Sequence, residues 1–321
     1  MKQRILVIGN PVAGRGAAGR IARAVDIIKS RGFKVRLMLT GKKGDAELFS
    51  KEIFKDQSEI PDTQPVPLII AAGGDGTYNE VINGIAYSDI PMAILPLGTT
   101  NVLARELDIP EVMEKALDIA LGGKVQNVCL GKITLREHKI QDSISKIQDS
   151  NFELRTLNSE LSRYFLLMAG IGFDGEAVYG IKSRIKRYSG KGAYIWSGLK
   201  TFMLWNPDKL TFNIDSRGYE GYSAIICNAA KYAGHFKVAP DAKLQEPSLY
   251  AFIMQGRKRS DIVRYVSGII RGNHLKFSDM TYRKAEKIEI NGKACIQIDG
   301  DYFGKTPATI EIVPDALKLV C

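Results

Sequence analysis

The first 125 residues alternate between short apolar runs and segments with helical apolar spacing. Runs of strand length are joined by stretches in which apolar residues recur every three or four positions. Strands separated by helices are connected by crossovers, and crossovers produce a parallel sheet covered on both faces. The pattern predicts an open α/β domain over residues 1–123. The expected strands are RILVIGN, KVRLMLT and, each with the loop that follows it, PLIIAAGGDGT and PMAILPLGTTN. The expected helices are Ala17–Ser30, Asp45–Phe54 and Tyr78–Ala86.

After Gly123 the pattern changes to strand-like runs joined by turn residues. It predicts a mostly antiparallel second domain, a β-sandwich over residues 124–321. One helix is expected within it at Ser260–Arg271, with Ser260 as N-cap and Gly272 as C-cap. A near-duplication, KIQDSIS then KIQDSNF, is expected to form an extended hairpin or an insertion. The expected strands are YFLLMAGIGFD, KLTFNID, YSAIICNAA, SLYAFIM, KIEI, ACIQIDGDYF and ATIEIVP.

Three of the N-terminal strands end in loops rich in glycine and hydroxyl groups. These loops read GNPVAGRG, GGDGT and PLGTTN. Glycine lets a ligand approach the backbone, and helix N-terminal amides attract anions. Strand ends of a parallel sheet share one edge, so a phosphate-binding crevice is predicted there. The Thr77 hydroxyl can form a hydrogen bond with a phosphate or ribose oxygen. Asp75 repels phosphate and is expected to act through a cation or water.

The first loop also fits two other phosphate-binding motifs incompletely. Gly14, Gly16 and Gly19 spell GxGxxG, but Thr40 stands where a dinucleotide fold needs an acid. The P-loop spacing is present, but Arg15 and Gly16 replace lysine and serine or threonine. A plain strand–helix turn remains an alternative. All the phosphate-binding interpretations predict an anion at the helix N-terminus, with Arg15 as a charged partner.

The net charge of +10 favours an acidic partner. Six basic residues and no acid lie in residues 182–200, aromatics lie within and after this stretch, and GRKRS near Arg257 adds a second cluster. A membrane-surface patch or a solvated face explains this pattern. Nucleic-acid motifs are missing, and no apolar run reaches the ~18 residues of a membrane helix. The four cysteines and three histidines have no metal-site spacing, so buried thiols in a reducing compartment are expected.

The segment GGDGTYNEVINGI resembles the nucleotide-binding motif of the diacylglycerol kinase catalytic-domain family. This family includes bacterial lipid kinases, sphingosine kinases and ceramide kinase. Five other segments are similar to family motifs and occur in the same order: NPVAGRG, LTGKKGDA, LPLGTTNVLAR, AGIGFDGEAV and IQIDGDYFGKTP. The resemblance covers nearly the whole chain apart from about Arg136–Ser162.

The resemblance implies a lipid kinase that uses ATP and Mg²⁺. Asp299 would be the general base, assisted by Asp301 and Asp75. Asp174 would join Asp75 in an aspartate–water–magnesium network. ATP would lie in a cleft between the domains, the lipid would enter from the second domain, and the last segment would return to the first domain. The implied ATP-binding residues are Asn10, Arg15, Thr40, Gly73, Gly74, Asp75, Gly76, Thr77, Asn79, Gly98, Thr99 and Asn101.

Four positions depart from the family pattern. Arg15 replaces a lysine, Val102 an aspartate and Asp301 a glutamate. Glu246 and Pro247 replace the Asp-Gly pair at which family members hold a structural magnesium, so that site is expected to be lost or remodelled. Asp299 and Asp301 are expected on one face of a strand, because strand side chains alternate.

Two alternatives to a lipid kinase stay open. One is a kinase of a soluble substrate, of the NAD kinase type. The other is a catalytically weak regulator that binds nucleotide or lipid, which the departures at Asp301, Val102 and Glu246-Pro247 favour. The lipid-kinase interpretation predicts a cytoplasmic protein that associates reversibly with an anionic membrane surface. It predicts no nucleic-acid partner, and the sequence indicates no oligomeric state.

Overall fold

The computed structural model describes residues 4–57, 67–136, 161–182, 202–232 and 235–321. The chain divides into two compact units. The first comprises Met1–Leu130, Ala229–Pro247 and Val313–Cys321, and the second comprises Gly131–Asn228 and Ser248–Ile312. The segment Ala229–Pro247 therefore lies in the first unit, whereas the sequence predicts it in the second domain. The KIQDS duplication and most of the basic stretch after Lys182 lie outside the described residues.

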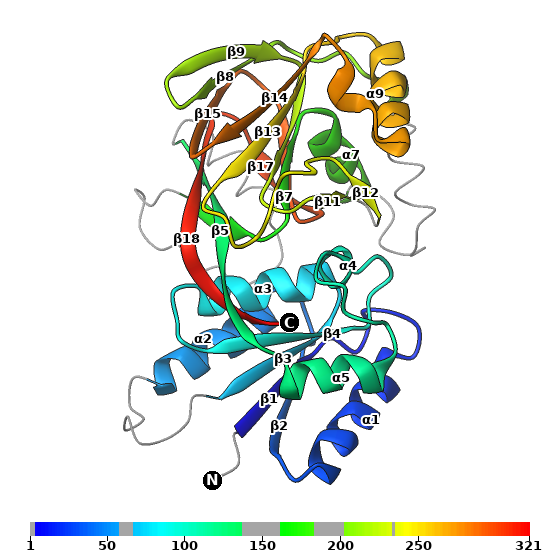
Figure 1. Cartoon of the computed structure of the whole chain (residues 1–321), viewed down its shortest axis with the longest axis vertical. Coiled ribbons are helices and arrows are strands. Elements are labelled where there is room, and N and C mark those ends of the chain that lie inside the picture. Colours follow the sequence, from blue (N-terminus) through cyan, green and yellow to red (C-terminus); the bar gives the residue numbers. More distant parts are fainter. Residues whose placement is uncertain (1–3, 58–66, 137–160, 183–201, 233–234) are drawn as a thin grey trace. The chain divides into compact units, whose positions relative to one another are not determined.

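The first unit is an α/β domain built on a parallel sheet. Its strands follow the order β2-β1-β3-β4, and the end of β18 joins β4 in parallel, with Lys318 opposite Pro91. Helices α2 and α3 cover one face, and α1 and α5 cover the other (Figure 1). The elements are β1 (Arg4–Gly9), α1 (Ala17–Ser30), β2 (Lys34–Leu39), α2 (Asp45–Gln57), β3 (Leu68–Gly73), α3 (Asp75–Ile85), β4 (Pro91–Pro96), α4 (Val102–Glu106), α5 (Met113–Gly122), β11 (Lys231–Tyr232) and β12 (Phe236–Lys237).

Helix α3 begins three residues earlier than the apolar spacing predicts. Gly74 is its extended N-cap, and the Gly74 carbonyl accepts the amides of Thr77 at 2.9 Å and Tyr78 at 3.1 Å. Asp75 therefore stands in the first helical turn, where a carboxylate interacts favourably with the helix dipole. Three of the five residues of the GGDGT segment are helix rather than loop, so the Asp75 and Thr77 side chains have fixed directions.

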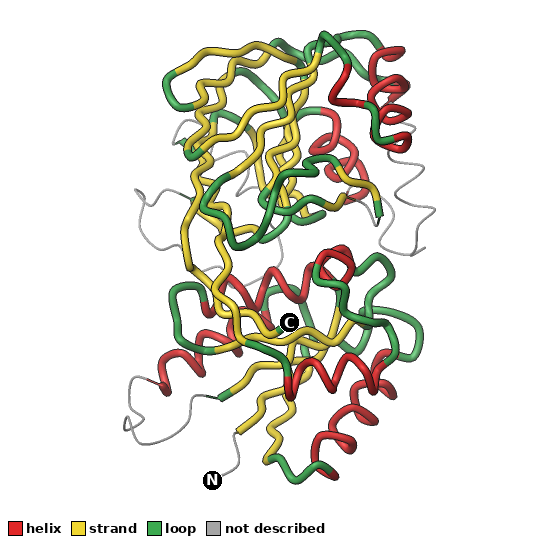
Figure 2. The backbone as a smooth tube through the Cα atoms, viewed as in Figure 1, coloured by secondary structure: helices red, strands yellow, loops and turns green. Residues whose placement is uncertain are grey.

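The second unit is an antiparallel β-sandwich. One sheet has the order β14-β13-β10-β7-β16-β17, and the other contains β18, β15, β8 and β9, while β5 pairs with β6. Figure 2 shows how strands dominate this unit. Its elements are β5 (Val125–Leu135), β6 (Ser162–Phe165), β7 (Met168–Ile171), α7 (Phe173–Lys182), β8 (Leu210–Ile214), β9 (Arg217–Gly221), β10 (Ser223–Cys227), β13 (Leu249–Met254), α9 (Arg259–Arg271), η2 (His274–Lys276), β14 (Met280–Ala285), β15 (Lys287–Asn291), β16 (Cys295–Ile298), β17 (Asp301–Lys305) and β18 (Ala308–Val320).

A single apolar core fills the space between these two sheets. Alternating side chains of β7, β10, β13 and β16 meet those of β8, β15 and β18, as a sandwich requires. Phe165 and Phe212 are among the largest buried side chains of this core. The four cysteines are thiols, and three of them are buried. None of the described helices is long and apolar enough to span a membrane.

The DGD segment forms a tight hairpin turn, so the prediction that Asp299 and Asp301 share one strand face is wrong. Ile298 pairs with Asp301, and the two residues between them have positive φ angles, 46° at Asp299 and 87° at Gly300. Two-residue hairpin loops with positive φ at both positions strongly prefer Asp-Gly. Asp301 opens β17, whereas Asp299 lies outside the strand.

Two other boundaries also differ from the prediction. YFLLMAGIGFD is two strands, β6 and β7, and its last two residues begin α7. Helix α9 begins at Arg259 with Lys258 as N-cap, rather than Ser260. Asp261 explains this start, because its carboxylate accepts the Lys258 amide at 2.9 Å. The predicted C-cap at Gly272 is confirmed by its left-handed φ of 68°.

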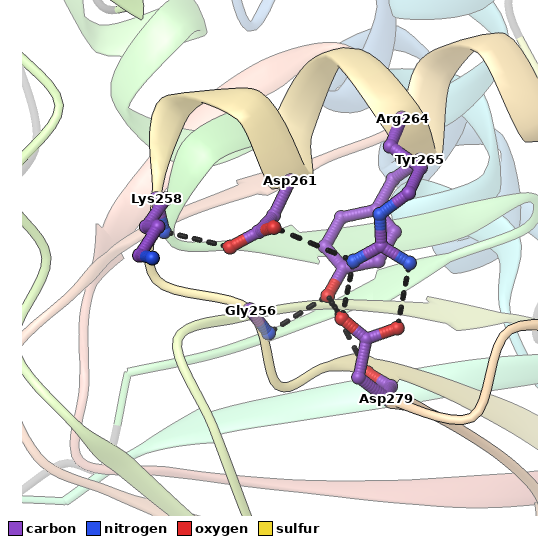
Figure 3. Close-up of polar contacts among 6 residues, drawn as sticks. All are labelled: Gly256, Lys258, Asp261, Arg264, Tyr265 and Asp279. Atoms are coloured by element: carbon purple, nitrogen blue, oxygen red, sulfur yellow. Dashed lines mark hydrogen bonds and ion pairs between the residues drawn. The ribbon is translucent and has the colours of Figure 1, made fainter.

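A polar cluster fastens α9 to the segment before β14 (Figure 3). The Arg264 guanidinium donates to Asp279 Oδ1 at 2.8 Å and also contacts Oδ2, while the Tyr265 hydroxyl donates to Oδ2 at 2.6 Å. The guanidinium lies over the Tyr265 ring, 4.8 Å from its centroid. The ion pair with Arg264 lowers the pKa of Asp279 from 3.8 to about 2.

We expect Asp279→Asn to lower the melting temperature at pH 7 and to match wild type near pH 2. The folded-state pKa of Asp279 lies below its value in the unfolded chain, so its stabilisation is full above pH 3.8 and is lost as the pH falls through about 2. Thermal unfolding of both proteins between pH 7 and pH 2 measures this difference. A gap in melting temperature that stays constant across that range would contradict it.

Candidate active site

The first unit has a topological switch point between β1 and β3. The chain leaves β1 to form β2 on one side, and it later forms β3 on the other side. Ligands of open α/β sheets bind beyond the carboxyl ends of the strands at such a point. The loops that follow β1 and β3 are two of the three glycine-rich segments, so the topology places them where a ligand is expected.

The first loop contacts both of the other loops. The Asn10 amide nitrogen donates to Thr77 Oγ1 at 3.4 Å, and its oxygen accepts the Val12 amide at 3.0 Å. A Cβ added at Gly14 would lie 2.4 Å from the Leu97 carbonyl oxygen, so only glycine allows this approach. Arg15 is exposed, and Gly16 has a φ of 70° at the start of α1. The first loop therefore packs against the other two loops, and its Arg15 side chain is exposed to solvent.

The second and third loops pack backbone to backbone. A Cβ on Gly98 would lie 2.7 Å from Gly74 Cα, a distance that real Cβ atoms essentially never show. The Gly73 carbonyl accepts the amides of Leu97 at 2.8 Å and Gly98 at 3.0 Å. The Tyr78 hydroxyl also donates to this carbonyl at 2.8 Å. The three strand ends therefore form one continuous edge, which we call the glycine edge: residues 10–16, 73–77 and 97–101.

Asp75 fastens the third loop to the second. Its Oδ2 accepts the Val102 amide at 3.0 Å, and its Oδ1 accepts the Leu103 amide at 3.1 Å. These amides begin α4, so the carboxylate caps that helix. Burial raises the pKa of Asp75, although the hydrogen bonds from Leu103 and Val102 oppose the increase. The structure therefore shows Asp75 in a positioning contact that the sequence does not predict.

The other predicted nucleotide-binding residues of the first unit differ in exposure. The Thr40 amide donates to the Gly9 carbonyl at 2.9 Å, which puts Thr40 at the end of β2 beside β1. Thr99 is exposed on the third loop. Asn101 is buried with a φ of 48°, and its amide group donates to the Gly98 carbonyl at 2.9 Å. Asn79 is buried in α3, where its side-chain oxygen accepts from Asn83 at 3.2 Å. Asn101 therefore braces the third loop from within, whereas the Asn79 contact lies within α3.

In the second unit, the Asp299 carboxylate accepts three backbone amides. Oδ2 accepts from Leu166 at 2.9 Å, and Oδ1 accepts from Leu167 at 2.9 Å and Met168 at 3.0 Å. The Asp299 amide in turn donates to the Met168 carbonyl at 3.0 Å. The hairpin turn is thereby locked onto the corner between β6 and β7. The three contacts therefore fix the direction of the Asp299 carboxylate.

Gln297 joins Asp174 to the same hairpin turn, and the sequence analysis missed it. Its amide nitrogen donates to Asp174 Oδ2 at 2.6 Å, and its oxygen accepts the Gly300 amide at 2.7 Å. The side chain is only 2% exposed. A Cβ at Gly170 would lie 2.0 Å from Asp174 Oδ2, so glycine leaves the space that this contact needs. Asp174, Gln297 and Asp299 therefore form one connected cluster, which we call the DGD cluster.

The resemblance implies two magnesium sites, one near Asp75 with the nucleotide and a structural one near Glu246, and the hydrogen bonds of these two carboxylates differ. Each oxygen of Asp75 accepts one amide, and a carboxylate oxygen has a second lone pair for a magnesium-bound water. Asp75 therefore fits an ion held mainly by nucleotide phosphates and water. Glu246 instead accepts from Lys243 Nζ at 2.8 Å. Among the described residues there is no group of three or more His, Cys, Asp or Glu side chains that could hold a metal ion. The Glu246 carboxylate is thereby paired with a cation of the chain itself, and the loss or remodelling of the structural magnesium site stays a prediction.

Two family models match the chain in succession. The diacylglycerol kinase catalytic domain matches residues 4–133, and the YegS C-terminal NAD kinase beta sandwich-like domain matches residues 168–321. Proteins named diacylglycerol kinase from Staphylococcus carnosus and Bacillus subtilis are each 27% identical over 315 residues. The first alignment covers 96% of this chain and 92% of the relative, and the second covers 95% and 92%.

Solved structures share the fold. A diacylglycerol kinase from Bacillus anthracis str. Sterne matches with a TM-score of 0.65 at 21% identity, over 99% of this chain and 96% of the other. Yeast NADH kinase complexed with NADH matches with a TM-score of 0.52 at 10% identity, over 100% and 84%. The chain therefore has the fold of the NAD kinase-like and diacylglycerol kinase-like proteins, an N-terminal α/β domain followed by an antiparallel β-sandwich.

Each half of the chain matches a different family model, and relatives named diacylglycerol kinase align with nearly its whole length. The chain is therefore similar over both halves to the diacylglycerol kinase catalytic-domain family, a family of lipid kinases. The predicted family and fold class are thereby confirmed, while the roles of individual site residues remain predictions.

Proposed function

We propose that this protein is an ATP-dependent kinase that phosphorylates the free hydroxyl of a diacylglycerol-like or long-chain lipid. The observation that carries the proposal is the glycine edge, where three loops meet so closely that Gly14 and Gly98 leave no room for a side chain. Such an edge at a switch point is suited to phosphate groups that need direct access to the backbone. The comparisons support a lipid as the acceptor substrate, because the relatives named above are called diacylglycerol kinases.

ATP is proposed to bind along the glycine edge. The α1 and α3 N-termini offer backbone amides and a favourable dipole to phosphate oxygens. Arg15 supplies positive charge, and Thr40, Thr77 and Thr99 supply hydroxyls for phosphate or ribose. Asp75 holds the second and third loops together, so the nucleotide meets a preformed surface. Magnesium, when bound with ATP near Asp75, would neutralise phosphate charge.

Asp299 is proposed as the general base that accepts the proton of the lipid hydroxyl. Phosphoryl transfer needs an oriented hydroxyl and a carboxylate that receives its proton as the oxygen–phosphorus bond forms. The three amide contacts fix the direction of the Asp299 carboxylate. Asp301 follows across the turn, and Asp174 is connected to the turn through Gln297. These neighbours are proposed to set the charge around Asp299.

A soluble substrate is the second candidate, and the fold likeness to yeast NADH kinase is its support. At 10% identity this likeness concerns the fold alone. The relatives named diacylglycerol kinase align with nearly the whole chain, which favours a lipid acceptor and a role in phospholipid metabolism at a membrane surface facing the cytoplasm. The changes at Asp301 and Val102 support the third candidate, a weakly active regulator.

Transfer of labelled γ-phosphate separates the three candidates. Purified protein is incubated with ATP and Mg²⁺, and parallel tubes contain a total lipid extract, defined diacylglycerol, and NAD with NADH. The proposal predicts label in an organic-phase lipid only. Label in the dinucleotide alone would replace the lipid-kinase proposal with the soluble-substrate one. Nucleotide binding without any transfer would favour the regulator.

A further inference from the structure

Helix α9 carries a stripe of apolar side chains that its own unit does not bury. Val263 is 56% exposed, Val266 46% and Ile270 57%. Spacings of three and four residues place them on one side of the helix. Leu275, just beyond the helix, is also exposed. Single exposed apolar residues are ordinary, but a stripe along one helix marks an interaction surface.

The same surface is strongly basic. Five exposed cations lie in the helix or within five residues of its ends: Arg257, Lys258, Arg259, Arg271 and Lys276. None of them forms an ion pair within the part of the chain that the structure describes. Arg259 is four residues from Val263, which puts its side chain on the apolar stripe.

The acids of this segment are held by its own residues. Asp261 accepts the Lys258 amide and contacts Arg264, and Asp279 pairs with Arg264 (Figure 3). Both carboxylates therefore have partners within this segment, whereas the five cations form no ion pair with any described residue. A partner with negative charge and an apolar layer would complement both properties of this surface.

The helix is firmly supported on its opposite side. Ile262, Tyr265 and Gly268 are buried, and a Cβ on Gly268 would lie 2.6 Å from the Phe277 ring. The hydrogen bond from Arg264 to Asp279 also joins the helix to the segment before β14. The exposed stripe is thus a fixed feature of a folded element.

Apolar exposure continues next to the helix N-terminus. Met203 and Leu204 are both exposed and precede Asn206. The Arg257 guanidinium donates to Asn206 Oδ1 at 3.3 Å, so this segment adjoins the beginning of α9. We call the whole area the α9 surface: Met203, Leu204, Arg257, Lys258, Arg259, Val263, Val266, Ile270, Arg271, Leu275 and Lys276.

We propose that the α9 surface docks this protein onto an anionic membrane. Apolar side chains beside unpaired cations are the composition of interfacial helices, in which the apolar side enters the headgroup boundary and the cations meet anionic lipids. The inference rests on the proposed function, because a kinase of a membrane lipid must reach its substrate at that surface. A second copy of this chain fits less well, because two such basic surfaces would repel each other.

Vesicle co-sedimentation tests the docking independently of catalysis. The full chain is mixed with phosphatidylcholine vesicles, with or without about one-third phosphatidylglycerol. We expect binding to the anionic vesicles, and we expect it to weaken at least tenfold in Val263→Ser/Val266→Ser/Ile270→Ser and in Lys258→Gln/Arg259→Gln. Raising the salt concentration should weaken wild-type binding further. The matched control, Leu48→Ser/Val112→Ser, removes side chains of similar exposure, 56% and 54%, from the first unit and should bind like wild type.

A second readout keeps docking apart from the kinase activity. In the first assay the substrate is a short-chain diacylglycerol in neutral detergent micelles, and both α9 variants should phosphorylate it as fast as wild type does. In the second assay the substrate is a long-chain diacylglycerol in anionic vesicles, and both variants should be at least tenfold slower than wild type. Unchanged vesicle binding in both α9 variants would overturn the docking proposal, as would wild-type protein that dimerises through this stripe and ignores vesicles. No turnover of any lipid by wild type that still binds vesicles would overturn the proposed function and leave the docking inference supported.

Discussion

Gly98→Ala is expected to weaken ATP binding by about tenfold or more. The new methyl group would lie 2.7 Å from Gly74 Cα and 2.7 Å from Asn101 Oδ1, so the second and third loops would have to separate. Forcing one extra methyl into closely packed backbone costs about 1–3 kcal/mol, and here that cost falls on the phosphate-binding edge. Nucleotide titration by calorimetry measures the change in affinity.

Gly19→Ala is the matched control for this prediction. Gly19 lies near the start of α1, and a Cβ there would meet no atom within 4 Å. Alanine suits a helix better than glycine, so this variant should bind ATP as wild type does and be slightly more stable. Equal ATP affinity in Gly98→Ala and Gly19→Ala would show that the close approach of the loops is irrelevant to nucleotide binding.

Asp299→Asn is expected to reduce turnover by about 100-fold or more and to destabilise the second unit. A missing general base costs about 10²–10⁴ in rate. The amide group of asparagine would also turn a donor toward one of the backbone amides that Asp299 accepts, at a cost of about 1–3 kcal/mol. Asparagine tolerates the positive φ of 46°, so the backbone turn itself is preserved.

Asp215→Asn separates the two effects of this substitution. Asp215 also has a φ of 46°, and its carboxylate accepts the amides of Glu286 and Lys287 in the same unit. This variant should lose stability in a similar way but keep its turnover at temperatures where it is folded. If Asp299→Asn kept the activity of Asp215→Asn, Asp299 would be a structural residue and not the base. Thermal unfolding and initial rates, measured side by side, decide the matter.

The glycine edge was predictable because its cause is local. Each loop follows a strand recognisable from its apolar run, and parallel strands deliver their carboxyl ends to one edge. Asn10, Gly74, Thr77 and Gly98 therefore come together as their sequence positions indicate. The contact of Asp75 with α4 was not predictable, because it depends on how the third loop turns after Gly98.

The DGD cluster was harder to predict from sequence. Strand alternation suggested one face for Asp299 and Asp301, but the Asp-Gly pair makes a two-residue turn and removes Asp299 from the strand. A preference of Asp-Gly for such turns was the available signal. Gln297 gave no signal, since it is a single polar residue in a buried strand. Its role appears only in the folded chain, where the Gln297 amide nitrogen contacts Asp174 of α7 and the Gln297 amide oxygen contacts Gly300 in the hairpin turn.

The central claim is that this chain transfers phosphate from ATP to a lipid hydroxyl, and product analysis tests it most directly. Wild type and Asp299→Asn are incubated with ATP, Mg²⁺ and 1,2-diacylglycerol in anionic vesicles, and phosphorylated lipid and ADP are quantified by mass spectrometry. We predict one phosphorylated lipid per ADP with wild type and a loss of about 100-fold or more with Asp299→Asn. ADP formed without phosphorylated lipid, or no turnover by protein that binds ATP, would contradict the account.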